Sequence, residues 1–264
     1  MREVAEVETP IGARSFVTSA QAYDRFMGRY SRQLAVHFAD FAGIERGMHV
    51  LDVGAGTGAL TAELLQRGAE VAAAEPSEEF VAALRERYPA VDVQRAPAEA
   101  LPWNEGLFDA VVSQLVVTFL PDGPIALQEQ RRVTRKGGVV AACMWELEGS
   151  ELLTLMNDVR TRLGVEGGER FERYRSEADL RTLFEEVELE DVATTTIEIS
   201  SEYGSVDDLW DAAVVSAGPG GAPGERMSPE ARTRGREIAA ELLGRPSGSF
   251  TLHARCACVR GIAP

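Results

Sequence analysis

The sequence of 264 residues contains very little lysine: Lys136 is the only one, and arginine supplies the rest of the positive charge. Lysine and arginine together number 27 against 42 aspartates and glutamates, which gives a net charge of −15. A protein that binds a nucleic-acid backbone or an anionic membrane presents a basic face. The composition therefore argues against both partners and leaves one candidate for any lysine-based catalysis.

Cysteine and long apolar runs are also scarce. The three cysteines, Cys143, Cys256 and Cys258, are too few for a disulfide scaffold, and no other ligands at zinc-site spacing accompany them. No segment approaches the roughly 18 unbroken apolar residues of a membrane span. The acidic residues 1–8 lack the apolar core of a signal peptide. We therefore expect a cytoplasmic protein with reduced structural cysteines, no metal and no membrane partner.

The pattern of the chain predicts a leader at residues 1–18, a helical segment at 19–43 and one main domain at 44–264. In the helical segment, apolar side chains recur at helical spacing and Gly43 ends the pattern. In the main domain, short apolar runs alternate with helical patterns. Strands are expected at residues 48–53, 70–74, 91–95, 108–114 and 139–144, and helices at 59–67, 77–88 and 123–134. This alternation predicts an α/β fold with a doubly wound, Rossmann-like parallel sheet.

The alternation loosens after residue 145. Helices are expected at residues 150–163, 176–186, 205–217 and 228–243, and strands at 187–199 and 250–259. These two strands bring the expected total to seven.

The most informative stretch is Val50-Leu51-Asp52-Val53-Gly54-Ala55-Gly56-Thr57-Gly58, which follows a strand and opens a helix. Glycines let a backbone approach a ligand closely. Glu75 ends the second strand, 21 residues after Gly54, where an acidic side chain can accept hydrogen bonds from both ribose hydroxyls. Two ligand classes fit the glycines: a dinucleotide, through Gly54-x-Gly56-x-x-Ala59, and S-adenosylmethionine, through Asp52-x-Gly54-x-Gly56-x-Gly58.

Five segments in order resemble the class I S-adenosylmethionine-dependent methyltransferases, in the branch of ubiquinone/menaquinone-biosynthesis C-methyltransferases and small-molecule enzymes. The segments lie at residues 50–60, Ala74-Glu75-Pro76-Ser77, 96–103, 108–114 and 132–138. The resemblance implies the sheet order 3-2-1-4-5-7-6 with the last strand antiparallel. It also implies a helical lid made from residues 19–43 and an insertion at about 205–247.

The resemblance implies S-adenosyl-L-methionine as the cofactor and suggests the residues that bind it. These are Tyr23, Tyr30, Arg32, Asp52, Gly54, Ala55, Gly56, Gly58, Glu75, Pro76, Ala98, Glu99, Gln114 and Leu115. One position departs from the family, which often has an acidic residue where Pro97 stands. Proline cannot accept the adenine amino group, so the adenine contacts are expected to shift to the Ala98 backbone and Glu99.

No residue stands out as a catalytic base. Tyr23, His37 and Trp145 are weak candidates, each with an equally plain role in packing or on the surface. Methyl transfer from a sulfonium is an in-line displacement, in which alignment and exclusion of water can suffice. His49 starts a strand, at the edge of the sheet away from a ligand, and is expected to be structural.

The predicted function is methylation of the oxygen, nitrogen or carbon of a small molecule. The run Ser113-Gln114-Leu115-Val116-Val117-Thr118-Phe119-Leu120 contains no Asn/Asp-Pro-Pro-aromatic sequence, which disfavours nucleic-acid bases as acceptors. Two alternatives stay open: a non-catalytic cofactor-binding or regulatory module, and a nicotinamide-dependent reductase. The reductase lacks a Tyr-x-x-x-Lys pair, because Arg132 stands four residues before Lys136. The oligomeric state is open, with a homodimer among the options.

Overall fold

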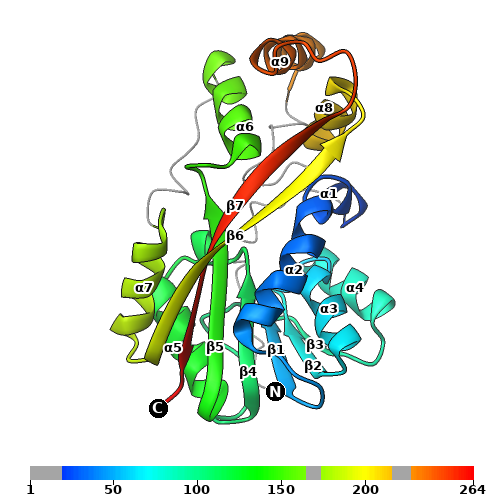
Figure 1. Cartoon of the computed structure of the whole chain (residues 1–264). Coiled ribbons are helices and arrows are strands. Elements are labelled where there is room, and N and C mark those ends of the chain that lie inside the picture. The colour runs from blue at the N-terminus through cyan, green and yellow to red at the C-terminus, as the bar shows by residue number, and fades with distance from the viewer. Residues whose placement is uncertain (1–19, 165–173, 216–226) are drawn as a thin grey trace.

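The computed structural model describes residues 20–164, 174–215 and 227–264 (Figure 1). The expected leader at residues 1–18 and the middle of the expected insertion, residues 216–226, lie outside the described residues. None of the helices in these three ranges is long and apolar enough to cross a membrane.

A seven-stranded sheet organises the fold. Its strands are β1 (His49–Val53), β2 (Glu70–Ala74), β3 (Asp92–Gln94), β4 (Phe108–Gln114), β5 (Thr134–Glu146), β6 (Glu190–Tyr203) and β7 (Phe250–Ile262). They are ordered β3-β2-β1-β4-β5-β7-β6, and β7 runs antiparallel to both of its neighbours. The expected fold class and strand order are confirmed. The central strands are largely buried, as strands covered on both faces must be.

Helices cover both faces of the sheet. They are α1 (Ala20–Phe26), α2 (Gly28–Ala42), α3 (Ala59–Arg67), α4 (Glu78–Arg87), α5 (Gly123–Val133), α6 (Glu151–Arg162), α7 (Glu177–Glu186), α8 (Val206–Val215) and α9 (Pro229–Leu242), with a short 3-10 turn at Val117–Phe119. α2, α3 and α4 pack on one face, and α5 and α7 on the other (Figure 1). Serine side chains cap several of these helices; Ser77, for example, accepts from the amide of Phe80 at the start of α4.

The expected N-terminal helical segment is divided into two helices. α1 ends at Phe26 and α2 begins at Gly28, with a turn at Met27 between them. Gly43 closes α2 in the left-handed conformation, as its position in the sequence predicts. The segment therefore consists of two separate helices that meet at Met27.

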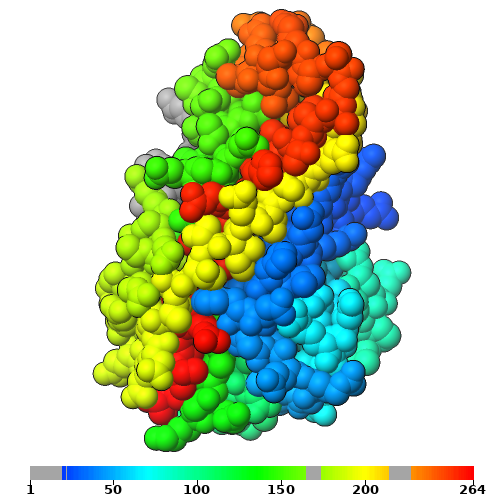
Figure 2. Space-filling model, in the orientation of Figure 1, coloured from blue at the N-terminus to red at the C-terminus, as the bar shows by residue number. Residues whose placement is uncertain are grey.

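The last two strands extend well beyond the main sheet. β5 stops at Glu146, which pairs with Arg255, whereas the pairing of β6 with β7 continues to Tyr203 and Phe250. The resulting two-stranded ribbon carries α8 and α9 at its far end (Figure 1). Figure 2 shows β6, in yellow, running diagonally beside α2, in blue. The sequence-based prediction ended the sixth strand at residue 199, too early, because the ribbon continues its hydrogen bonding without the main sheet.

Gly138, in the first half of β5, lies close to backbone atoms of β4 and of its own strand. A Cβ on Gly138 would lie 2.7 Å from the carbonyl oxygen of Asp109 and 2.9 Å from that of Arg135, both backbone atoms that cannot rotate away. Gly138→Ala is therefore expected to lower the free energy of unfolding by about 1–3 kcal/mol, measured by urea denaturation. The matched control is Gly248→Ala, whose new methyl group meets nothing within 4 Å. The free energy of unfolding of the control should stay within about 0.5 kcal/mol of that of the parent. Equal effects from both substitutions would contradict the close contacts at Gly138.

Candidate functional site

The glycine-rich turn between β1 and α3 requires glycine for two physical reasons. Gly54 has φ of 71°, and a Cβ built on it would lie 2.5 Å from Cγ2 of Val116. Another residue there would both strain the backbone and collide with the segment that follows β4. The loops after β1 and β4 thus approach each other closely at the point where the strand order reverses, the position at which doubly wound sheets bind ligands.

Glu75 joins the end of β2 to this turn. It is 5% exposed, and its Oε2 accepts from the amide of Gly56 at 2.9 Å while Oε1 accepts from the amide of Ser77 at 2.8 Å. Burial raises the pKa of Glu75 to about 7, and the two amide donors act in the opposite direction. Each carboxylate oxygen keeps a second lone pair, so Glu75 can still accept hydrogen bonds from ligand hydroxyls.

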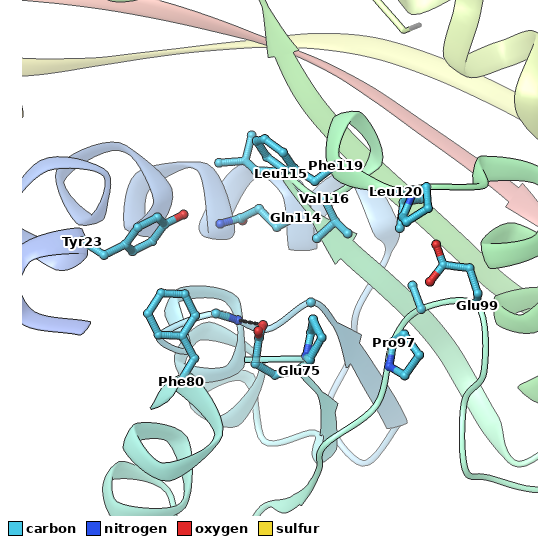
Figure 3. A pocket seen from close by; sticks show the side chains of 15 residues that line it. Tyr23, Glu75, Phe80, Pro97, Glu99, Gln114, Leu115, Val116, Phe119 and Leu120 are labelled. Atoms are coloured by element: carbon cyan, nitrogen blue, oxygen red, sulfur yellow. Dashed lines mark hydrogen bonds between the residues drawn. The ribbon is translucent and has the colours of Figure 1, made fainter. Parts of the chain in front are cut away.

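A cleft with about 700 Å³ of empty space opens at the carboxyl ends of the central strands (Figure 3). Its lining consists of Tyr23, Gly54, Gly56, Glu75, Pro76, Phe80, Pro97, Ala98, Glu99, Gln114, Leu115, Val116, Phe119, Leu120 and Pro121. A neighbouring cavity of about 340 Å³ shares several of these residues and adds Ser31, Asp52, Ala55, Thr57, Ala59 and Leu60. Together the two cavities bring eleven of the fourteen expected cofactor residues to one place.

Three buried side-chain oxygens around the cavities have no hydrogen-bond partner within the described ranges. They are Oγ of Ser31, Oε1 of Glu99 and Oε1 of Gln114. The amide nitrogen of Gln114 is occupied, because it donates to the carbonyl of Ser31 at 3.0 Å. Buried acceptors without donors are rare in folded proteins. The site is therefore suited to a ligand that carries N–H or O–H groups.

Pro97 and Ala98 line the cleft, with Pro97 on the far side of Glu75 from Phe80 (Figure 3), at the position where the family often has an acidic residue. Figure 3 shows the carboxylate of Glu99 close to Leu120 on that side of the cleft. Proline contributes an apolar wall there and no acceptor side chain. Glu99 is thus the one carboxylate that the described residues offer at this end of the cleft.

Asp52 is a buried carboxyl group at the smaller cavity. Thr61 donates its hydroxyl to Oδ2 of Asp52 at 2.6 Å. Burial raises the pKa of Asp52 to about 7, although the hydrogen bonds from Thr61 lower it. Asp52 therefore changes its protonation state near neutral pH.

Tyr23 reaches both cavities from α1. Its ring packs against that of Phe80 on α4, with 5.8 Å between the ring centroids. Burial raises the pKa of the Tyr23 phenol, and the carboxylates of Glu75 and Asp24 raise it further. The hydroxyl therefore stays protonated at neutral pH and can donate a hydrogen bond into the cleft but not act as a base.

The structure does not bring the other three expected cofactor residues to either cavity. Tyr30 is fully buried under the ribbon, where its hydroxyl donates to the carbonyl of Leu252 at 3.3 Å and lies 3.2 Å from that of Tyr203. Arg32 points to solvent, with its side chain 67% exposed and 3.9 Å from Asp24. Gly58 starts α3 behind the turn. The N-terminal segment thus supplies Tyr23 and Ser31 instead.

Two of the three weak catalytic candidates also lie elsewhere. His37 is exposed on α2, outside the residues that line the cavities. Trp145 is the second-last residue of β5, and its side chain is on the face covered by α2, where it is 6% exposed and packs edge-on against Tyr30. An acceptor cannot stack on a ring that is enclosed in this way. Tyr23 is the remaining candidate at the cleft.

The residues expected to be structural lie in the sheet. The three cysteines are buried in β5 and β7, and no group of histidine, cysteine, aspartate or glutamate within the described residues has the arrangement of a metal site. His49 opens β1, with its ring 4.6 Å from that of Phe108, at the edge opposite the cleft.

Sequence reasoning missed the apolar wall formed after β4 and the side chain that α4 contributes. Val116, Phe119, Leu120 and Pro121 follow β4, and Phe80 comes from the first turn of α4. One signal was available in principle: apolar residues directly after a predicted strand, at the edge where ligands bind. Leu115 adds another feature invisible in the sequence, a φ of 63°, and such strained residues gather at functional sites.

Comparisons of sequence identify the central part of the chain. The model of the methyltransferase domain family matches residues 51–142. An uncharacterised protein of Mycobacterium tuberculosis is 36% identical over 128 residues, which are 46% of this chain and 47% of that protein. A malonyl-[acyl-carrier protein] O-methyltransferase of Pectobacterium atrosepticum is 34% identical over 129 residues, 49% of this chain and 51% of that protein. The matched segment thus spans about half the length of these relatives.

Solved structures show the same fold over most of the chain. A candidate type II methyltransferase of Anaeromyxobacter dehalogenans is 22% identical with a TM-score of 0.63, covering 88% of this chain and 96% of that one. The phosphoethanolamine N-methyltransferase 2 of Haemonchus contortus, solved with S-adenosylhomocysteine, is 13% identical with a TM-score of 0.59 and covers 93% of this chain and 57% of that one.

The buried carboxyl of Asp52 predicts a particular dependence of stability on pH. The pKa of Asp52 is about 7 in the folded chain, against 3.8 ordinarily, so the native state retains a proton that the unfolded state loses. The retained proton therefore adds to the free energy of unfolding below pH 4, and this contribution is lost as the pH rises toward 7. Asp52→Asn cannot ionise, so it should gain stability relative to the parent by about 1 kcal/mol per pH unit between pH 5 and 7. Urea denaturation at pH 5, 6 and 7 measures this difference; a constant difference would contradict the raised pKa.

Proposed function

Because residues 51–142 form a methyltransferase domain of the class I, S-adenosylmethionine-dependent kind, we propose that the protein methylates an oxygen, nitrogen or carbon atom of a small molecule. The domain indicates S-adenosylmethionine as the cofactor. The observation that carries the proposal is the pair of adjoining cavities at the switch point of the sheet. Glu75, the glycine turn and three oxygens that have no partner among the described residues line them.

The residues of the two cavities fit the groups of this cofactor. Glu75 can accept from the ribose hydroxyls through the lone pairs that Gly56 and Ser77 leave available. Oε1 of Glu99 lacks a donor, which the amino group of adenine would provide. Oε1 of Gln114 and Oγ of Ser31 lack donors at the smaller cavity, which would suit the ammonium group of the methionine part.

When it is bound, the cofactor supplies an electrophilic methyl group on a sulfonium. The chain contributes alignment: Tyr23 and Phe80 wall the cleft on one side, and the segment after β4 walls it on another. Apolar walls exclude water, and a fixed geometry converts an encounter between two molecules into a reaction within one complex. The protonated hydroxyl of Tyr23 can hold an acceptor by donating a hydrogen bond.

The charge of the residues that line the cavities limits which charge the methyl acceptor can carry. The described residues that line the two cavities include the carboxyl groups of Asp52, Glu75 and Glu99 and no lysine, arginine or histidine. An acceptor with a free carboxylate would meet like charge without a compensating cation. We therefore favour an uncharged or cationic small molecule, which differs from the malonyl group named for the relative in Pectobacterium atrosepticum.

Calorimetric titration tests the cofactor part of the proposal. S-adenosylhomocysteine is expected to bind with micromolar affinity, on the order of −8 kcal/mol, and NADH is expected not to bind. Glu75→Ala should weaken the binding by about 1–3 kcal/mol, the scale of losing a charged hydrogen bond. Tyr30→Phe is the matched control, because it also removes a buried polar group but one bonded to Leu252 and Tyr203 away from the cleft. Binding of NADH in place of S-adenosylhomocysteine, or equal losses of affinity in both variants, would refute the assignment of the site.

Methyl transfer itself is tested by an acceptor screen, scored as release of S-adenosylhomocysteine.

A further inference from the structure

The carboxylate of Asp24 ties α1 to the glycine turn. Its Oδ1 accepts from the hydroxyl of Thr57, between Gly56 and Gly58, at 2.5 Å. Its Oδ2 accepts from Nη2 of Arg87, at the end of α4, at 3.0 Å. Arg87 in turn donates through Nη1 to the backbone carbonyl of Thr57 at 2.6 Å. Three elements that surround the cleft are thus joined by one closed set of hydrogen bonds.

The setting makes these contacts stronger than an ordinary surface pair. The side chain of Asp24 is 17% exposed, and both of its oxygens are used. Hydrogen bonds to an ionised carboxylate are shorter and stronger than those between neutral groups, and partial burial reduces their screening by water. The Asp24 contacts therefore contribute to holding α1 in place.

The neighbouring residues define what α1 covers and where it can pivot. Tyr23, adjacent to Asp24, extends over both cavities. α1 and α2 are separate helices that meet at Met27. α2 has its own attachments: Arg29 binds Asp208 on α8 through two hydrogen bonds of 2.7 and 3.1 Å, and Gln33 donates to the carbonyl of Ser200. Movement of α1 about Met27 would lift Tyr23 from the cleft while α2 stayed in place.

We propose that Asp24 is a positioning residue that latches α1 onto the glycine turn and thereby sets how fast the cofactor enters and leaves. The inference rests on the proposed cofactor site. Asp24 does not line either cavity, so it acts through Thr57 and Tyr23 rather than by touching the cofactor. Opening the latch lowers the barrier in both directions, so association and dissociation accelerate together.

Surface plasmon resonance with S-adenosylhomocysteine tests the latch. In Asp24→Ala, the association and dissociation rates are each expected to rise about tenfold, the scale of one charge-assisted hydrogen bond, with the Kd changed by less than about threefold. Thr57→Val removes one of the two partners of Asp24 and leaves Arg87 bound to it, so both rates should rise together but by less than in Asp24→Ala. The double variant should be no faster than Asp24→Ala, because the contact that Thr57→Val removes is already lost in Asp24→Ala.

The matched control is Asp40→Ala. Asp40 is also an aspartate within a helix and is bound to an arginine, Arg67, at 2.7 Å, but on the part of α2 away from the cleft. Alanine favours a helix at both positions, so loss of helix formation does not distinguish the two variants. The latch would be refuted if Asp24→Ala and Asp40→Ala showed the same association and dissociation rates. It would also be refuted if Asp24→Ala raised the dissociation rate alone.

Hydrogen exchange of residues 20–26 without any ligand separates the latch from the cofactor assignment. Asp24→Ala and Thr57→Val should accelerate exchange in α1, and Asp40→Ala should not. The parent protein could fail to bind S-adenosylhomocysteine while exchange in α1 accelerates in Asp24→Ala and Thr57→Val only. In that case the cofactor assignment is wrong and the contact that holds α1 is supported. Unchanged exchange in Asp24→Ala would reject that contact whatever the ligand.

Discussion

The site depends on one hydrogen bond, which the amide of Gly56 donates to the carboxylate of Glu75. The parallel register sets up this contact, because Val53 pairs with Ala74, the last residue of β2, and Glu75 directly after it therefore faces the glycine turn. A carboxylate buried at this edge needs donors, and the turn provides one while the start of α4 provides another through Ser77. The shapes of the turn, the β2–α4 connection and the cleft between them are thus determined together.

The sheet and most helices could be predicted because their signals are local. Apolar runs gave the strands, and the helix starts expected at residues 77, 176 and 228 lie within one residue of those in the structure, where serines cap the helices. The same holds for the centre of the site: the glycine turn and Glu75 are a short motif whose geometry follows from one strand–turn–helix unit.

The outer parts of the site could not be predicted because they depend on contacts between distant segments. Tyr30 and Tyr23 lie on the same helical pattern, yet only Tyr23 reaches the cleft, since the ribbon of β6 and β7 crosses over Tyr30. Arg29 and Arg32 are equally plausible partners for an anion by sequence. In the structure Arg29 forms an ion pair with Asp208 of α8, and Arg32 points to solvent. The length of the ribbon decides both outcomes, and no local pattern encodes it.

The acidity of the protein has a consequence for the order in which ligands exchange. S-adenosylmethionine carries a net positive charge that its demethylated product lacks, because the sulfonium becomes a neutral thioether. A chain with net charge −15, whose cleft holds Glu75 and Glu99, attracts the cation from a distance and does not attract the neutral product. Electrostatics therefore favours replacement of the product by the cofactor without any cationic residue at the cavities. The excess of acidic side chains, which at first only argued against nucleic acid and membranes, thus fits the proposed exchange of product for cofactor at the site.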